Sequence, residues 1–580
     1  MRAKAKTKYN FLQGAVILTV STVLVKLIGM LYKIPLANML GGTGMSYFMT
    51  AYSIFSPIYA LSAAGFPAAV SKLVSENAAV GRYRDVRKIF HIAWGLFLLI
   101  GLCGFLLLLF SGGAIAHRIG NPHAALAVTA LAPALLFCCL MSVWRGYYQG
   151  LGNMMPTAVS QVVEAVAKLV CGIGLGYLAL QTGLRQYEQT GMVFGAAVSG
   201  GVAQAELAVL PYAAAGAVLG VSVSTALGTL FLFFRGLLGS SGIPKETALA
   251  SSAAEPSKSI LKKLALIALP VCLASAVGHL TGLIDVATVM TRIGVAVQRD
   301  AQTVLGMYSL PAHVTAQELP SYLYGAFGYT SSLYNLVPAL TVALGISGLP
   351  ALSVHWALRD MARVNAQASS LVKIAALIAI PVGLGLAALP EPILLLLYPN
   401  RLQEAVIAAP ILRAMGIAAV FSGIAVPLNS VFQAIGRADI PVKLMCAGGI
   451  FKITANYILL AVPSVNIKGV PYGTIACYAF IVAGGIWCLR TVANIRIDIA
   501  GSFVKPLACG IFCMLAANTS YALLMRAFPS RWNTLLAIAV GGVIYAVFVL
   551  FLKIITKNEA LMLPNGKKIV KILEKLSCLG

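Results

Sequence analysis

Charged residues are scarce in this chain of 580 residues: only 10% are Asp, Glu, Lys or Arg, whereas 59% are hydrophobic. Soluble globular proteins are about 25% charged and about 45–50% apolar, so a string of soluble domains is excluded. Apolar stretches follow one another from residue 11 to residue 556, and about 20 apolar residues are enough for a helix to cross a bilayer. The sequence therefore predicts an all-α polytopic membrane protein.

Motifs for catalysis and for cofactors are also missing. The longest connections expected on the outer side have about 30 residues and contain no DxD, HExxH or GxSxG pattern, which a membrane enzyme would be expected to carry. The eleven cysteines show no paired CxxC spacing, and all except Cys578 lie in or beside apolar segments. Unpaired cysteines in apolar segments usually behave as small buried hydrophobic residues. We therefore predict no catalytic residue, no metal site and no cofactor.

Fourteen segments are apolar and long enough to span a bilayer. They cover residues 11–39, 44–71, 86–110, 122–148, 156–180, 208–235, 262–290, 322–355, 367–389, 404–431, 440–462, 468–489, 503–526 and 533–556. If the N-terminus is cytoplasmic, 27 of the 42 Lys and Arg residues lie in inner connections and 8 in outer ones. Because basic connections stay on the cytoplasmic side, both termini are predicted to be cytoplasmic. This arrangement accounts for the net charge of +25 without a nucleic-acid partner.

The two halves of the chain resemble each other. The run Leu61-Ser-Ala-Ala-Gly-Phe-Pro-Ala68 aligns with Leu344-Gly-Ile-Ser-Gly-Leu-Pro-Ala351 at an offset of 283, and Gln149-Gly-Leu-Gly152 aligns with Gln433-Ala-Ile-Gly436 at an offset of 284. Six spans in each half would give both halves the same orientation, as in transporters built from parallel repeats. We expect two six-helix lobes followed by two additional transmembrane helices.

The repeat predicts the domain boundaries. The expected parts are an N-terminal lobe over 1–240, a flexible cytoplasmic linker over 241–261, a C-terminal lobe over 262–495, two additional helices over 496–556, and a basic amphipathic tail over 557–580. The linker is rich in Gly, Ser, Ala and Pro, which is typical of flexible connections. The tail alternates lysines with apolar residues, a pattern that suits a helix lying on anionic lipid.

Each half places a glycine and a proline inside a predicted span. These are Gly65 and Pro67 in the first half, and Gly348 and Pro350 in the second. A proline within a span removes a backbone hydrogen bond, and neighbouring helices or water must satisfy the freed carbonyl group. We therefore predict equivalent broken or kinked helices that serve as hinges.

Four basic groups near mid-span are related by the repeat. Lys26 aligns with His279, and Lys168 aligns with Lys452 at an offset of 284. A charge inside the membrane normally faces a wet interior or a partner, so the sequence predicts a central cationic cavity. Lysines can meet a diphosphate as point charges, which favours an anionic substrate. An inside-negative potential would drive that substrate outward, at about 2.3 kcal/mol per charge for each 100 mV.

Other interpretations of these groups stay open. Glu164 lies four residues before Lys168 and would form a local ion pair with it on one helical face. Asp285 would either pair with Lys26 or Lys33 or bind a proton or Na⁺. A packed, hydrogen-bonded role is equally open for the histidine at 279.

Three runs of sequence resemble a known family. They are Trp144-Arg-Gly-Tyr-Tyr-Gln-Gly-Leu-Gly-Asn-Met-Met-Pro-Thr-Ala-Val-Ser-Gln161, Ala64-Gly-Phe-Pro-Ala-Ala-Val-Ser-Lys72 and Val342-Ala-Leu-Gly-Ile-Ser-Gly-Leu-Pro-Ala-Leu-Ser353. They are similar to the polysaccharide-biosynthesis flippases, and more narrowly to the stage V sporulation protein B and MurJ-like lipid II flippase branch of the multidrug/oligosaccharidyl-lipid/polysaccharide superfamily. The resemblance covers nearly the whole chain. It implies MATE-like lobes that rock by alternating access, and two extra helices beside a groove for a lipid tail.

The resemblance also implies roles for particular residues. The family carries an arginine midway along its first helix, where this chain has Lys26, and a second arginine where this chain has Tyr32 followed by Lys33. Arg145 is included on the same basis. The family's acidic residue and arginine in the second helix fall near Ser46 and Tyr59, so this chain departs from the pattern there.

Together these features predict a flippase that moves an undecaprenyl-diphosphate-linked cell-wall precursor, lipid II or a related oligosaccharide, from the inner to the outer leaflet. Such a protein would serve peptidoglycan or polysaccharide biosynthesis, in growth or in sporulation. The residues predicted to bind substrate are Lys26, Lys33, Arg145, Lys168, His279 and Lys452. Glu164 and Asp285 are predicted as coupling-ion or charge-pair residues, with a proton or monovalent cation as partner, in a monomer surrounded by membrane lipids. The alternatives are a cation-coupled multidrug exporter of the same superfamily and, less favoured, a membrane glycosyltransferase.

Overall fold

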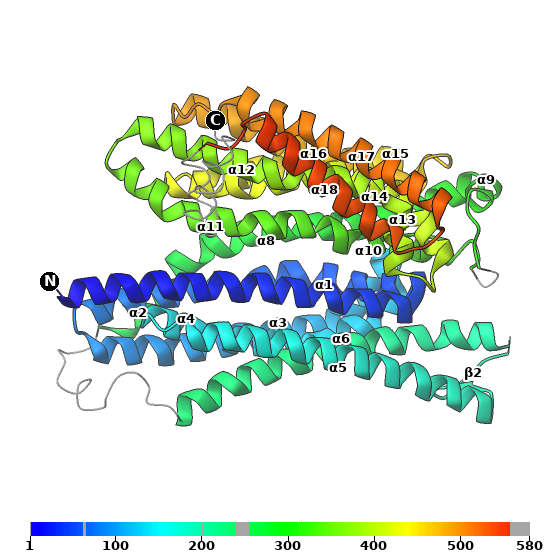
Figure 1. Cartoon of the computed structure of the whole chain (residues 1–580). Coiled ribbons are helices and arrows are strands. Elements are labelled where there is room, and N and C mark those ends of the chain that lie inside the picture. Colours follow the sequence, from blue (N-terminus) through cyan, green and yellow to red (C-terminus); the bar gives the residue numbers. More distant parts are fainter. Residues whose placement is uncertain (1, 62–64, 200, 239–254, 312–313, 557–580) are drawn as a thin grey trace. The chain divides into compact units, whose positions relative to one another are not determined.

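The computed structural model describes residues 2–61, 65–199, 201–238, 255–311 and 314–556. Most of the predicted linker and the whole basic tail therefore lie outside the described residues. The described chain is almost entirely helical (Figure 1), which confirms the all-α polytopic class. The helices are α1 (Arg2–Tyr59), α2 (Phe66–Ala79), α3 (Tyr83–Ile119), α4 (Ala125–Gly150), α5 (Met155–Thr190), α6 (Val202–Leu238), α8 (Ser257–Arg299), α9 (Ala301–Gly306), α10 (Leu319–Tyr334), α11 (Leu336–Ala357), α12 (Met361–Ala388), α13 (Pro390–Leu397), α14 (Leu402–Ala434), α15 (Asp439–Leu459), α16 (Val470–Val492), α17 (Lys505–Ala527) and α18 (Asn533–Phe551).

The described β-structure is a two-residue hairpin between α5 and α6. Strand β1 (Met192–Val193) pairs antiparallel with β2 (Ala196–Ala197). The turn residues Phe194 and Gly195 have φ values of 44° and 88°, which match the twist that a two-residue hairpin turn needs. Three short helical segments complete the described fold, at Pro122–Ala124, Asn466–Gly469 and Ala500–Val504.

The chain packs as two compact units. The first contains the described residues as far as Gly294 together with Pro311–Gly325, and the second contains Val295–Leu310 and the described residues from Ala326 onward. Most of α8 therefore packs with the first unit, although the repeat assigns that helix to the second half of the sequence. The predicted domain boundaries stay a prediction.

Helix α1 contains two arms that run in opposite directions. Gly41 interrupts it with φ 65° and ψ −171°, a left-handed backbone conformation that glycine adopts without a steric penalty. The rings of Tyr32 and Phe48 lie 6.1 Å apart. Residues 16 positions apart in one straight helix would be separated by about 24 Å along its axis, so the chain reverses at Gly41. The first two predicted spans thus occupy one element.

Twelve helices of the described chain are long and apolar enough to cross a membrane. The two arms of α1 count among them as one helix. The eighth predicted span, which is not among the twelve, is divided into α10 and α11 by a turn at Asn335. The number fourteen stays a prediction, because length and composition alone define these spans.

The two Gly/Pro positions differ in structure. Gly65 immediately precedes α2 and Pro67 lies in its first turn, where the missing N–H has no helical partner in any case. In the second unit, the backbone stays helical through Gly348 and Pro350 within α11, so the helix is not broken there, and a kink or hinge at these positions stays a prediction. Proline's fixed φ lies in the helical range, although proline leaves one backbone carbonyl without its helical hydrogen bond. The interruption lies instead at Asn335.

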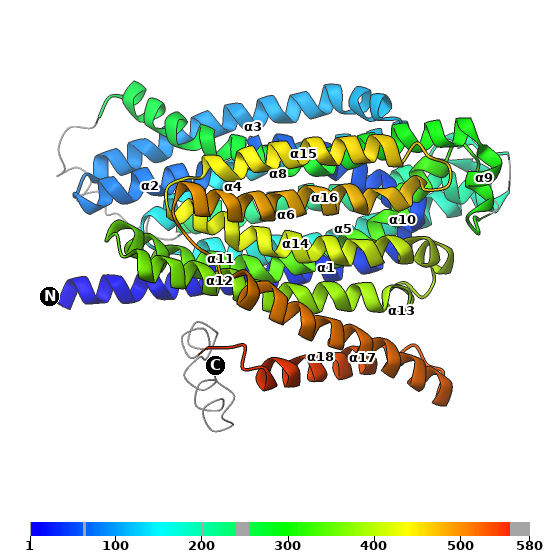
Figure 2. The same ribbon diagram turned by 90° about the horizontal axis from the view of Figure 1, so that it is seen from above.

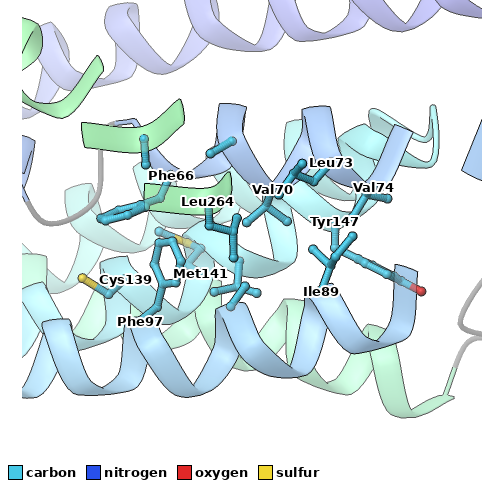
Figure 3. Close-up of a cluster of buried hydrophobic side chains, with 14 of the residues drawn as sticks. Phe66, Val70, Leu73, Val74, Ile89, Phe97, Cys139, Met141, Tyr147 and Leu264 are labelled. Atoms are coloured by element: carbon cyan, nitrogen blue, oxygen red, sulfur yellow. The ribbon is translucent and has the colours of Figure 1, made fainter. Parts of the chain in front are cut away.

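Close contacts between small residues hold the first unit together. Figure 3 shows the hydrophobic cluster where α2, α3, α4 and α8 meet, with Phe66, Val70, Phe97 and Leu264 among the labelled side chains. A Cβ added to Gly146 of α4 would lie 2.7 Å from the carbonyl oxygen of Pro67 and 2.8 Å from the Cβ of Val70. The glycine therefore sets the distance between α4 and α2.

In the second unit, the two C-terminal helices pack on α12. Figure 2 shows α17 and α18 side by side at the edge of this unit. Phe512 and Phe548 stack with ring centroids 4.6 Å apart, and the hydroxyl of Tyr545 donates to the carbonyl oxygen of Leu377 at 2.9 Å. A Cβ added at Gly510 of α17 would lie 2.5 Å from Cγ2 of Ile380 in α12, so the two helices are in direct contact.

We expect Gly146→Ala to destabilise the first unit by about 1–3 kcal/mol, because the new methyl group overpacks the α2–α4 contact. Gly95→Ala is the matched control, since a Cβ at Gly95 meets no atom within 4 Å. Replacing an exposed helical glycine by alanine should stabilise by about 0.5–1 kcal/mol. Thermal unfolding of both variants in the same detergent tests this pair. Equal melting temperatures for the two variants would contradict the packing argument.

Candidate functional site

Charged side chains gather where α1, α4 and α5 meet in the first unit. Helix α5 carries Glu164 and Lys168 one turn apart, and α4 carries Arg145 near its C-terminal end. The two arms of α1 contribute Lys33 and two tyrosines. All of these residues belong to elements of one unit.

Arg145 is bound on two sides by α5. One terminal nitrogen of its guanidinium lies 2.9 Å from a carboxylate oxygen of Glu164, and its Nε donates to the hydroxyl of Ser160 at 3.0 Å. The Ser160 hydroxyl in turn donates to the carbonyl oxygen of Thr157. The side chains of Arg145 and Glu164 are 15% and 26% exposed. The planar fork of an arginine suits such a two-point contact, so Glu164 is paired with Arg145 rather than with Lys168.

Lys168 lies instead between two aromatic rings. Its Nζ is 5.3 Å from the ring centroid of Tyr32 and 4.9 Å from that of Tyr52, both within the range of a cation–π interaction. None of the described carboxylates lies within ion-pair distance of this ammonium group. The negative faces of the rings stabilise the lysine, and Glu164, one turn away on α5, interacts with it electrostatically from beyond ion-pair distance.

The two tyrosines are held differently. Tyr32 is 1% exposed, and its hydroxyl donates to the carbonyl oxygen of Ala217 at 3.1 Å. A Cβ at Gly172 would lie 2.7 Å from the Tyr32 ring, so this glycine makes room for it. The hydroxyl of Tyr52 is buried and has no hydrogen-bond partner among the described residues. A buried polar group without a partner is costly, and this one lies beside a lysine.

Two further lysines extend this basic region along α1. Lys33 is half-buried and interacts electrostatically with Lys168. Lys26 is exposed and precedes Lys33 by seven residues, a spacing that returns to the same helical face after two turns. Lys26, Lys33, Arg145 and Lys168 therefore carry positive charge through one region of the first unit, which we call the basic cluster.

The other predicted site residues lie elsewhere. His279 is exposed on α8, whereas Asp285, further along that helix, is 8% exposed and interacts electrostatically with Tyr324. The hydroxyls of Tyr324 and Ser53 are 3.4 Å apart, so Asp285 belongs to a polar contact between α8, α10 and the second arm of α1. Lys452 lies on α15 in the second unit and is 3% exposed. The common cavity predicted for all these groups stays a prediction.

The sequence does not indicate which residues hold the two cations. Tyr32 and Tyr52 lie against Lys168, and Ser160 accepts a hydrogen bond from Arg145, yet no motif points to Tyr52 or Ser160, and Tyr32 stands out only as a departure from the family pattern. A usable signal was the aromatic residue beside Lys33, because rings in a span can stabilise a cation. Helical spacing alone does not predict that the second arm of α1 packs near α5.

The structure and the sequence together define a multi-pass transporter fold. A family model described as polysaccharide biosynthesis protein matches residues 11–328, which is more than half of the chain, and a second model, described as MatE, matches residues 304–458. The chain belongs to the polysaccharide biosynthesis protein family. The resemblance seen in the sequence is thereby confirmed.

Three relatives from Bacillus subtilis (strain 168) are similar to the chain. The uncharacterized membrane protein YabM is 24% identical over 570 residues, covering 97% of this chain and 96% of YabM. Stage V sporulation protein B is 22% identical over 570 residues, covering 97% of this chain and 100% of that protein. The lipid II flippase MurJ is 33% identical over 181 residues, covering 30% of this chain and 33% of MurJ.

Two solved structures share the fold. The inward closed conformation of lipid II flippase MurJ has a TM-score of 0.64 at 14% identity and covers 93% of this chain and 98% of its own. The inward-facing conformation of a multidrug resistance MATE family transporter has a TM-score of 0.62 at 15% identity and covers 83% and 98%. The chain therefore has the fold common to MATE transporters and MurJ flippases.

The Arg145–Glu164 pair should contribute measurably to stability. We expect Arg145→Gln and Glu164→Gln each to cost about 1–3 kcal/mol. The double variant should lose less than the sum of the two, by about 1–2 kcal/mol of coupling free energy. This is below the cost of breaking a fully buried pair, since both side chains are partly exposed. Thermal or denaturant unfolding of the four proteins measures the coupling.

The surface pair Lys72–Glu76 provides the control for that cycle. Its atoms are 4.0 Å apart and its side chains are 59% and 56% exposed, so its coupling should stay below about 0.5 kcal/mol. A coupling at Arg145–Glu164 no larger than at this pair would show that the inner ion pair is not a structural contact of the first unit.

Proposed function

We propose that this protein is a flippase for a lipid-linked anionic sugar, translocated from the inner to the outer leaflet of the bacterial cytoplasmic membrane. The substrate proposed is an undecaprenyl-diphosphate-linked precursor such as lipid II or a related oligosaccharide. The observation that carries the proposal is the lysine at 168, which rests on the faces of Tyr32 and Tyr52 rather than on a carboxylate. Its charge is therefore available to an anionic headgroup.

The composition of the basic cluster supports an anion rather than a cation. It holds four basic side chains and one carboxylate, and that carboxylate is paired with Arg145. Lysines bind phosphate groups as compact point charges, and arginine binds them through a planar fork. The family membership and the flippase named among the relatives favour the same class of substrate.

The membrane potential supplies a direction for transport. We place both termini in the cytoplasm, with two six-helix lobes that alternate about a central cavity and two additional helices beside them. A diphosphate headgroup leaving an inside-negative cell gains roughly twice the 2.3 kcal/mol per charge that 100 mV provides.

The substrate-binding residues proposed are Lys26, Lys33, Arg145, Lys168, His279 and Lys452. The protein would act as a monomer, and its coupling would use the potential alone or a proton or monovalent cation at Glu164 or Asp285.

A cation-coupled multidrug exporter is the second candidate. It is favoured by the MatE match over residues 304–458 and by the similarity to a multidrug resistance MATE transporter. Such an exporter needs carboxylates that face its cargo. In the described part of the first unit, the glutamate of the basic cluster is already engaged by an arginine, so we rank this function second.

The deciding experiment reconstitutes the protein in liposomes with a defined membrane potential. Exposure of lipid II to an outside reagent and release of a cationic dye are measured in parallel. We expect lipid II exposure that increases with an inside-negative potential, without dye movement. Dye movement without lipid II exposure would instead establish the exporter function.

Substitutions in the basic cluster test the site itself. We expect Lys168→Ala to reduce lipid II exposure at least about tenfold, equivalent to about 1.4 kcal/mol of binding free energy, and Lys168→Arg to retain part of the activity. Lys26→Ala should abolish flipping while leaving membrane insertion intact. Lys505→Ala, an exposed lysine at the start of α17, is the control and should behave as the wild type. Full activity in Lys168→Ala would remove this lysine from the transport site.

A further inference from the structure

A second candidate site lies at the end of the first unit where α3 begins and α4 and α6 end. A cavity of about 220 Å³ is lined there by Arg87, Phe90, His91, Trp144, Tyr147, Tyr148 and Gly236. None of these residues belongs to the basic cluster. Ligand pockets for whole small molecules measure about 300–1,000 Å³, so this cavity fits a headgroup rather than a complete ligand.

Four aromatic rings build the walls of the cavity. Phe90 lies 4.7 Å from Trp144 and 5.0 Å from Tyr147, measured between ring centroids in edge-on arrangements. Trp144 stacks beside Tyr148 at 6.1 Å with an interplanar angle of 24°. Tyr147 lies at the edge of the hydrophobic cluster in Figure 3, with its hydroxyl pointing away from the other labelled side chains. Rings packed this tightly form a rigid wall.

A glycine keeps the cavity open. Gly236 lies two residues before the last residue of α6, and a Cβ built there would overlap the Trp144 ring. Any larger residue at this position would therefore push the indole into the space that the cavity occupies.

Basic side chains surround the cavity. Arg87 and His91 line it, and Arg235 interacts electrostatically with Tyr148 at its edge. The nearest carboxylate along α3, that of Asp85, is 2% exposed and accepts a hydrogen bond from the backbone N–H of Glu255 at 2.7 Å. The Glu255 carboxylate lies 2.5 Å from the Nζ of Lys263. These two described acids are thus engaged elsewhere, and the residues that line the cavity include no acid.

The position of the cavity along its helices matches the depth of lipid headgroups. Its lining residues lie within the first three turns of α3 and the last two turns of α4 and α6. Trp and Tyr concentrate at the membrane–water interface, and basic pockets between transmembrane helices bind the phosphate groups of anionic lipids. An aromatic cage for a quaternary ammonium would not carry an arginine in its wall, because the two cations would repel.

We infer that this cavity binds the phosphodiester headgroup of an anionic phospholipid of the phosphatidylglycerol type, with the phosphate on Arg87 and His91 and the glycerol carbons against the aromatic rings. The acyl chains remain outside the cavity among the bilayer lipids. This inference does not depend on the substrate of the proposed flippase, since the cavity shares no residue with the basic cluster.

Short-chain lipids test the inference on the full-length protein in a neutral detergent. Dioctanoyl-phosphatidylglycerol should raise the melting temperature and remain bound in native mass spectra, whereas dioctanoyl-phosphatidylcholine should do neither. Arg87→Gln should weaken phosphatidylglycerol binding about tenfold, consistent with loss of a charge-assisted contact. The control Arg82→Gln removes an exposed arginine near the same helix end that does not line the cavity, and it should bind as the wild type does.

Two further variants separate a lost contact from a disturbed fold. Arg87→Lys should restore part of the binding, and Gly236→Ala should weaken it by filling the cavity. Equal binding of the two lipids, or unchanged phosphatidylglycerol binding in Arg87→Gln with the parent protein's lipid-free melting temperature, would overturn the inference. Inorganic phosphate that displaces the lipid at equal concentration would also overturn it, because the site would then recognise a free phosphate rather than a headgroup.

Discussion

The contacts of the basic side chains in the first unit follow from the free-energy cost of placing a charge in a low-dielectric interior. A basic side chain within a span needs a partner, an aromatic face or water, and this protein uses the first two side by side on one turn of α5. Arg145 forms an ion pair with Glu164. Lys168, one turn further along α5, lies against the rings of Tyr32 and Tyr52. Because an ion pair neutralises charge and a cation–π contact does not, two cations of equal formal charge differ in what they offer to a ligand.

Small residues make this arrangement geometrically feasible. The ring of Tyr32 reaches the lysine because Gly172 leaves space on α5, and the second arm of α1 returns to α5 because Gly41 adopts a positive φ. Neither glycine carries a charged or polar side chain. Each fixes the backbone path that brings aromatic faces to the cation, so the electrostatics of the site depend on positions that carry no charge.

Helical class and family were predictable from the sequence, because long apolar runs and local motifs encode them, whereas the number of spans stays a prediction. The pairing within the basic cluster was only partly predictable. Helical spacing places Glu164 and the following lysine on one face, but the competing arginine comes from α4, and no local pattern reports a contact between residues 19 positions apart. The break at Gly65 follows from local chemistry, whereas the similar motif at Gly348 and Pro350 lies within a continuous helix, so the motif alone does not decide where a helix ends.

Neither compact unit is built from one uninterrupted stretch of chain. The backbone passes from the first unit to the second after Gly294, returns at Pro311 and leaves again after Gly325. During synthesis, the first unit therefore lacks part of its core until residues well past the midpoint of the chain have left the ribosome. Expressing the two halves of the sequence as separate polypeptides, divided between α6 and α8, would leave the N-terminal fragment without α8. With this topology, the two halves of the sequence do not correspond to two independently folding units.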